Sequence, residues 1–116
     1  MAVLTGKKTI TQTDYLHTDD GVTHVSVDNV FGGTVTVYAM HQVVPSGVTY
    51  LRIWDDPAPV NGTTEPDFIF RMSEEAAWTC IEGIEFTNFS YAAVTQNGTS
   101  GATVPAVTVA LHCVVR

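Results

Sequence analysis

The sequence predicts a single all-β domain built as an antiparallel β-sandwich of about seven strands. Apolar and polar residues alternate with the period of two that is typical of strands, and turns rich in Pro, Gly and Asn separate the alternating runs. No run has the periodicity of an amphipathic helix. The length of 116 residues fits one domain, and 45% hydrophobic with only 15% charged residues argues against disorder.

The N-terminal half of the chain contains the first three expected strands. A short strand at residues 22–27 is followed by residues 34–44, where valine alternates at first with threonine or tyrosine. Pro45-Ser46-Gly47 is expected to end this strand, because proline supplies no ladder donor. Residues 48–55 then alternate again and are expected to return as its antiparallel hairpin partner.

The C-terminal half contains four further expected strands. The polar corner Ser73-Glu74-Glu75 is expected to separate the first two, and the turn Gln96–Gly101 precedes the last. These strands are residues 67–72, 77–82, 86–95 and 104–115. Their apolar positions predict a common buried face with the earlier strands, and the expected core residues are Val35, Val37, Leu51, Ile53, Phe68, Phe70, Phe86, Val107, Val109 and Leu111.

The start of the chain has a different character. Residues 1–20 are rich in Thr and Asp and have weak periodicity, so they are expected to form an extended N-terminal arm that becomes ordered against a neighbour. The sandwich domain is then residues 21–116. No apolar signal region or membrane-spanning run is found, so we expect neither conventional export nor a membrane location.

The charge balance limits the classes of partner. The formal net charge is -7, and the basic residues are scattered at Lys7, Lys8, Arg52, Arg71 and Arg116. The electrostatic field of a negatively charged domain repels phosphate backbones and anionic lipid, so nucleic acid and membranes are not expected partners.

Charged residues are also unevenly distributed along the chain. None occurs between Asp28 and Arg52, and none between Glu85 and Arg116. One interpretation is that another subunit covers part of the outer sheet surface in these blocks. The alternative is a neutral, threonine-rich face that is simply solvated.

No arrangement of residues predicts an enzyme, a cofactor or a metal site. His17 with Asp19 and Asp20 is the only local cluster of metal-ligand types, and we expect it to be solvated. Cys80 and Cys113 lie in alternating apolar contexts, which favours buried free thiols over a disulfide between strands.

Residues 56–66, DPAPVNGTTEP, predict the main partner-binding loop. Three prolines hold the loop in shape, and rigid loops lose little entropy on binding. The residues expected to touch a partner are Asp56, Pro57, Ala58, Pro59, Val60, Asn61 and Gly62. Three Asn-x-Ser/Thr triplets occur, at Asn61, Asn88 and Asn97, and the two that read Asn-Gly-Thr are best explained as turn chemistry.

The stretch from Tyr50 to Arg116 resembles a family of small bacteriophage virion proteins of the capsid decoration or cement type. The shared pattern stands here as Tyr50-Leu51-Arg52-Ile53-Trp54-Asp55, Pro59-Val60-Asn61-Gly62-Thr63-Thr64-Glu65-Pro66, Gly83-Ile84-Glu85-Phe86-Thr87 and Val107-Thr108-Val109-Ala110-Leu111. The chain departs from the pattern at residues 73–78, where many relatives have a small polar turn. The expected sandwich is immunoglobulin-like or jelly-roll-like. The resemblance implies a β-sandwich that decorates a capsid, or lies elsewhere on the virion, usually as a symmetric oligomer.

The expected function is therefore a cement protein, made in the host cytoplasm, that binds the major capsid protein on the outer surface of the head. We expect a homotrimer, because capsid lattices offer threefold sites that a trimer matches. The alternative is a tail fibre or spike component that binds a host surface, with Trp54 and Trp78 near an exposed carbohydrate or protein site. A third class, a free carbohydrate-binding module, would be a monomer.

Overall fold

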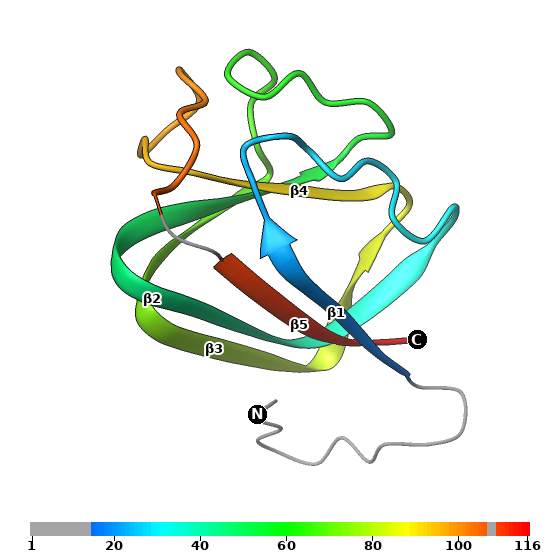
Figure 1. The fold of residues 1–116 in the computed structure, drawn as a ribbon. Coiled ribbons are helices and arrows are strands. Elements are labelled where there is room, and N and C mark those ends of the chain that lie inside the picture. The colour runs from blue at the N-terminus through cyan, green and yellow to red at the C-terminus, as the bar shows by residue number, and fades with distance from the viewer. Residues whose placement is uncertain (1–14, 107–108) are drawn as a thin grey trace.

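The computed structural model describes residues 15–106 and 109–116, which form five strands and contain no helix (Figure 1). The strands are β1 (Tyr15–Val22), β2 (Val35–Asp55), β3 (Phe68–Phe86), β4 (Phe89–Val94) and β5 (Val109–Val115). All strand pairs are antiparallel, and the predicted all-β sandwich is confirmed. The described part of the chain therefore contains no helix that could span a membrane.

The two long strands, β2 and β3, run through both layers of the sandwich. The N-terminal half of β2 pairs with β5, which pairs in turn with β1. The C-terminal half of β2 pairs with β4, and β3 follows β2 along both halves. One layer therefore has the order β1-β5-β2-β3 and the other has β4-β2-β3. Figure 1 shows the two long strands curving together from one layer into the other, which is how strands form the corners of a sandwich.

The hairpin expected between residues 34–44 and 48–55 is wrong, because both runs belong to β2. Pairing with β3 is interrupted locally: Val43 lies opposite Glu75, whereas Val48 lies opposite Ser73. The extra residues form a bulge, and proline is tolerated at such a position. The strands expected at 67–72 and 77–82 are likewise one strand, because β3 keeps pairing with β2 across the polar corner.

A second bulge lies near the other end of β3. Val37 is opposite Ile84, but Ala39 is opposite Thr79. Gly83 lies in this bulge with a φ of 80°, a conformation that residues with a Cβ rarely adopt. A Cβ there would also come within 2.9 Å of the Tyr38 ring. The sharp bend of β3 therefore requires glycine at this position.

Three expectations about the edges of the sheets are corrected. The arm expected at residues 1–20 is wrong for residues 15–20, which belong to β1, a strand that pairs with β5, while residues 1–14 lie outside the described part of the chain. Alternate positions of this edge strand are exposed, which explains its polar, weakly periodic sequence. The strand expected at 22–27 is wrong, because after Val22 only Val27 makes a β-bridge, with Tyr91 of β4. The closing strand expected from residue 104 is also corrected, because residues 104–106 are not in a strand, whereas β5 spans Val109–Val115; residues 107 and 108 lie outside the described part of the chain.

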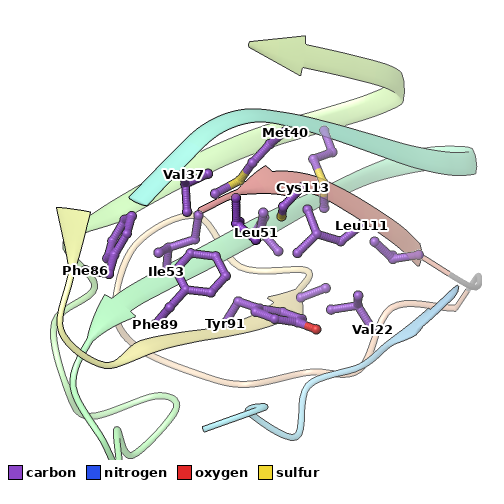
Figure 2. Packing of buried hydrophobic residues seen from close by; sticks show 14 of the residues in the cluster. Val22, Val37, Met40, Leu51, Ile53, Phe86, Phe89, Tyr91, Leu111 and Cys113 are labelled. Atoms are coloured by element: carbon purple, nitrogen blue, oxygen red, sulfur yellow. The ribbon is translucent and has the colours of Figure 1, made fainter. Parts of the chain in front are cut away.

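The core lies between the two layers (Figure 2). Rings of Phe86 and Phe89 meet edge to face with centroids 4.9 Å apart where the chain crosses from β3 to β4. Most of the predicted core residues are confirmed as buried: Val35, Val37, Leu51, Ile53, Phe86, Val109 and Leu111. Phe68 is wrong, because it is 37% exposed at the very start of β3, and Phe70 beside it is only partly buried against the core. Val107 lies outside the described residues.

The charge-free blocks of the sequence contain two central strand segments, the buried strand β4 and several loops. The first contains the N-terminal half of β2, which lies between β5 and β3. The second contains β4 and β5; β5 lies between β1 and β2, and all six residues of β4 are buried. The strands that carry several acidic residues, β1 and β3, are the edges of the larger layer. Central position therefore accounts for the missing charges of β5 and of the N-terminal half of β2, but not for those of the exposed positions in residues 95–106.

Candidate binding face

Loops cover the outer side of the β4-β2-β3 layer. Residues 56–67 and 95–106 cross it, and residues 23–34 run beside β4; their combined surface is called the loop face below. Arg52 and Trp54 of β2 point toward these loops, since the alternate residues Leu51 and Ile53 belong to the core. Both outward side chains are completely buried, so the loops form a packed third layer.

The predicted contact residues occupy different environments within the first of these loops. Pro57 and Ala58 are exposed, and Val60 is 59% exposed. Of the other predicted contact residues, Pro59 is buried, and Asp56, Asn61 and Gly62 are half-buried. Pro57, Ala58 and Val60 therefore offer most of the side-chain surface that this loop presents to a partner.

Hydrogen bonds fix the shape of this loop. The Asp56 carboxylate accepts the backbone N–H of Ala58 at 2.8 Å, and the Thr64 hydroxyl accepts that of Val60 at 2.9 Å. The indole N–H of Trp54 donates to the carbonyl of Thr64 at 3.0 Å, which ties the loop to β2. Such local bonds hold the backbone of a loop in one conformation.

Arg52 joins the three loops. Its guanidinium donates to Asn61 Oδ1 at 2.7 Å, to the carbonyl of Gly101 at 2.6 Å and to the carbonyl of Ser100 at 3.3 Å. Asn61 in turn donates through Nδ2 to the carbonyl of His24 at 2.6 Å. One side chain from β2 therefore holds residues 56–67 and 95–106 directly and residues 23–34 through Asn61.

Ser90 of β4 adds a second link between two of these loops. Its hydroxyl donates to the carbonyl of Asp56 at 2.6 Å and accepts the backbone N–H of Asn29 at 2.9 Å. Together with the Arg52 contacts, these bonds make the loop face a rigid surface. A rigid surface loses little conformational entropy when it binds a partner.

The charges of the loop face are separated by depth. The three loops contain no Lys or Arg. Arg52 lies beneath them, and burial lowers the pKa of its guanidinium because the charged form loses solvation. The exposed charges are carboxylates, at Asp28, Glu65 and Asp67. A partner therefore meets an acidic surface.

Each of the three loops also exposes one valine. Val25 is 65% exposed, Val60 is 59% exposed and Val104 is 49% exposed. Single exposed aliphatic residues are common on protein surfaces, but here they belong to loops that Arg52 holds together. This combination of rigidity and exposed aliphatic side chains is suited to docking against another protein.

A second polar cluster ties β1 to β4. The Tyr91 hydroxyl donates to Asp19 Oδ2 at 2.7 Å, and His17 Nε2 lies 3.1 Å from the same hydroxyl. Tyr91 is 1% exposed, and burial with the Asp19 contact raises the pKa of its hydroxyl. Burial lowers the pKa of His17, an effect that Asp19 partly offsets. His17 and Asp19 thus belong to a structural network instead of the solvated cluster expected from sequence.

The other candidate ligands do not assemble into a site. His112 lies 3.3 Å from Asp20 and 5.8 Å, between ring centroids, from His41. Across the described residues, no group of three or more His, Cys, Asp or Glu side chains could hold a metal ion. Cys80 and Cys113 are both free thiols, and burial raises the pKa of Cys113 to about 12.

The tryptophans give no support to the fibre or spike alternative. Trp54 has no exposed surface, so it cannot stack on a sugar at a surface site. The side chain of Trp78 lies outside the part of the chain that can be described. No protein-family model, curated protein or solved structure matches this chain.

Proposed function

We propose that this chain is a structural protein of a bacteriophage virion, which binds the major capsid protein on the outer surface of the head and stabilises the shell. The observation that carries the proposal is the loop face: three loops, held by the buried Arg52, present exposed aliphatic side chains on a rigid surface. The resemblance of residues 50–116 to capsid decoration proteins supports the choice of partner. The proposal assigns the chain no catalytic activity and no cofactor.

The geometry suits a protein that works by attachment. Because hydrogen bonds already fix the loops, docking costs little ordering of the backbone. The exposed valines can bury apolar surface, at roughly 25 cal/mol for each Å² removed from water. The net charge of -7 suits an outer position, away from packaged nucleic acid.

Attachment by one small surface is weak, so the proposal includes a homotrimer. Once one subunit has bound, the others bind at high effective concentration if the sites share the symmetry of the oligomer. This part of the proposal depends on the resemblance and on capsid symmetry. The buried strands of the charge-free blocks add no support to it.

The proposal is tested by binding purified protein to phage heads that lack it. We expect it to sediment with heads, to appear on their outer surface by electron microscopy, and to have the mass of a trimer by light scattering. Val60→Asp should reduce head binding, whereas Leu16→Asp should not, because Leu16 is 54% exposed but lies on β1. A monomer that never joins heads would refute the proposal, and binding to tails alone would favour a fibre or spike component.

A further inference from the structure

The chain contains the same tripeptide, Asn-Gly-Thr, twice in the loop face, at Asn61 and at Asn97. An asparagine followed by glycine is open to spontaneous deamidation, because glycine has no side chain to hinder attack by its own backbone nitrogen on the asparagine amide. The sequence alone gives both sites the same reactivity. The structure places them in opposite environments.

Asn61 is held at both ends of its amide group. Oδ1 accepts the guanidinium N–H of Arg52 at 2.7 Å, and Nδ2 donates to the carbonyl of His24 at 2.6 Å. The following residue, Gly62, is packed too, since a Cβ there would lie 3.4 Å from the carbonyl oxygen of Gly101. Rotating the Asn61 side chain toward its own backbone would break both hydrogen bonds inside a packed layer.

Asn97 is exposed, and within the described residues its side chain makes no hydrogen bond. The base of its turn is closed, because the backbone N–H of Thr103 donates to Gln96 Oε1 at 2.9 Å. At the tip, Gly98 has a φ of 114°, and a Cβ there would have no atom within 4 Å. The Asn97 amide and the Gly98 nitrogen can therefore change their relative orientation without disturbing any packing.

We propose that Asn97 is a site of spontaneous deamidation and that the Arg52 contacts protect Asn61 from the same reaction. The backbone nitrogen of Gly98 attacks Cγ of Asn97, a new C–N bond forms, and the side-chain amide leaves as ammonia with the proton from that nitrogen. The product is a cyclic succinimide. Water then opens either carbonyl of the ring and gives aspartate or isoaspartate at position 97.

The reaction changes the charge of the loop face. Residues 95–106 contain no charged side chain, so the product carboxylate is the first charge in this loop. It is added to a surface whose exposed charges are already acidic, at Asp28, Glu65 and Asp67. The loop face of an aged molecule is therefore more negative than that of a newly made one, and isoaspartate also lengthens the backbone by one bond.

The test is peptide mapping of the purified, folded protein after incubation at mildly alkaline pH. Trypsin places Asn61 in the peptide 53–71 and Asn97 in the peptide 72–116, so mass spectrometry reports the two sites separately, and fragmentation separates Asn97 from Asn88. We expect Asn97 to lose its amide about a hundredfold faster than Asn61, because reaction at Asn61 first requires the loss of two hydrogen bonds.

Two controls make the comparison decisive. In urea-unfolded protein both sites should react at similar rates, because they share one tripeptide sequence. The variant Gly98→Ala should slow the reaction at residue 97 in the folded protein, with an unchanged far-ultraviolet circular dichroism spectrum showing that the fold is kept. Equal rates at the two sites in the folded protein would overturn the proposal. So would an Asn97 that stays intact while the unfolded chain is converted.

Discussion

Replacing Asn61 by Ala should destabilise the protein by about 3 kcal/mol. The side chain accepts a charge-assisted hydrogen bond from Arg52 at 2.7 Å and donates one to the carbonyl of His24 at 2.6 Å. A hydrogen bond to a charged group contributes about 1.5–3 kcal/mol, and a neutral one contributes about 1 kcal/mol. Because Arg52 is completely buried, water cannot easily replace the lost acceptor.

Two further variants separate this explanation from a general effect of alanine in a loop. Asn97→Ala changes the same tripeptide at an exposed site, so its effect should be within about 0.5 kcal/mol. Asn61→Asp keeps an acceptor for Arg52 and adds a counter-charge, but it places a second acceptor against the carbonyl of His24. Its loss should be smaller than that of the alanine variant, at about 1 kcal/mol.

The assay is urea unfolding followed by circular dichroism, with the three variants and the parent protein measured under the same conditions. Hydrogen exchange gives an independent reading, because amides in residues 56–67 and 95–106 should exchange faster in the alanine variant if Arg52 holds both loops. A loss of less than about 1 kcal/mol for Asn61→Ala, or a loss equal to that of Asn97→Ala, would refute the role given to Arg52.

Other predictions concern the β1–β4 network and the bend of β3. Tyr91→Phe removes the hydroxyl that contacts Asp19 and His17 and should cost about 2 kcal/mol in thermal unfolding, and no loss would contradict its structural role. Burial lowers the pKa of His17 below its usual 6.5, so the unfolded state binds more protons than the folded state near this pH. The contribution of neutral His17 to the free energy of unfolding is therefore complete above pH 6.5 and is lost as the pH falls below it. The free energy of urea unfolding, measured at several pH values, should therefore fall less steeply toward acid pH in His17→Gln than in the parent protein. An equal dependence on pH would contradict the lowered pKa of His17. Gly83→Ala should cost about 3 kcal/mol through backbone strain and steric overlap, whereas Gly33→Ala, with open space around the site, should be nearly neutral; equal effects would rule out the strained bulge.

The alternation of apolar residues predicts many of the strands correctly, but residues that usually break strands led to wrong predictions of where the strands end. The patterns of residues 34–44 and 48–55 predict strands correctly, since strand pairing depends on the side chains that face the core. Pro45 and Gly47 suggested a turn between them. The sheet instead absorbs these residues in a bulge because β3 continues alongside, which is a long-range pairing that no local window contains.

The candidate site was predictable only in part. Three prolines identify residues 56–66 as a rigid loop, and the exposed positions of Pro57, Ala58 and Val60 agree with that prediction. The contact of Arg52 with Gly101 joins residues 49 positions apart, and no local pattern reveals it. The sequence does contain a sign that this outer face is covered. Arg52 is a basic residue between the apolar Leu51 and Ile53, and Trp54 lies on the same face of the strand.

The distribution of charge also bears on how the protein could assemble. The acidic residues of β1 and β3 lie on the two edge strands of the larger layer, and charged edge strands hinder pairing with another sheet. The described edge of β4 is also protected, since the backbone of Val27 exchanges hydrogen bonds with Tyr91 at 2.9 and 3.1 Å. A self-assembling interface built by joining sheet edges is therefore disfavoured. Subunits of the proposed trimer should therefore meet through side-chain contacts outside the loop face, so Val60→Asp should weaken attachment to heads while the mass measured by light scattering stays that of a trimer.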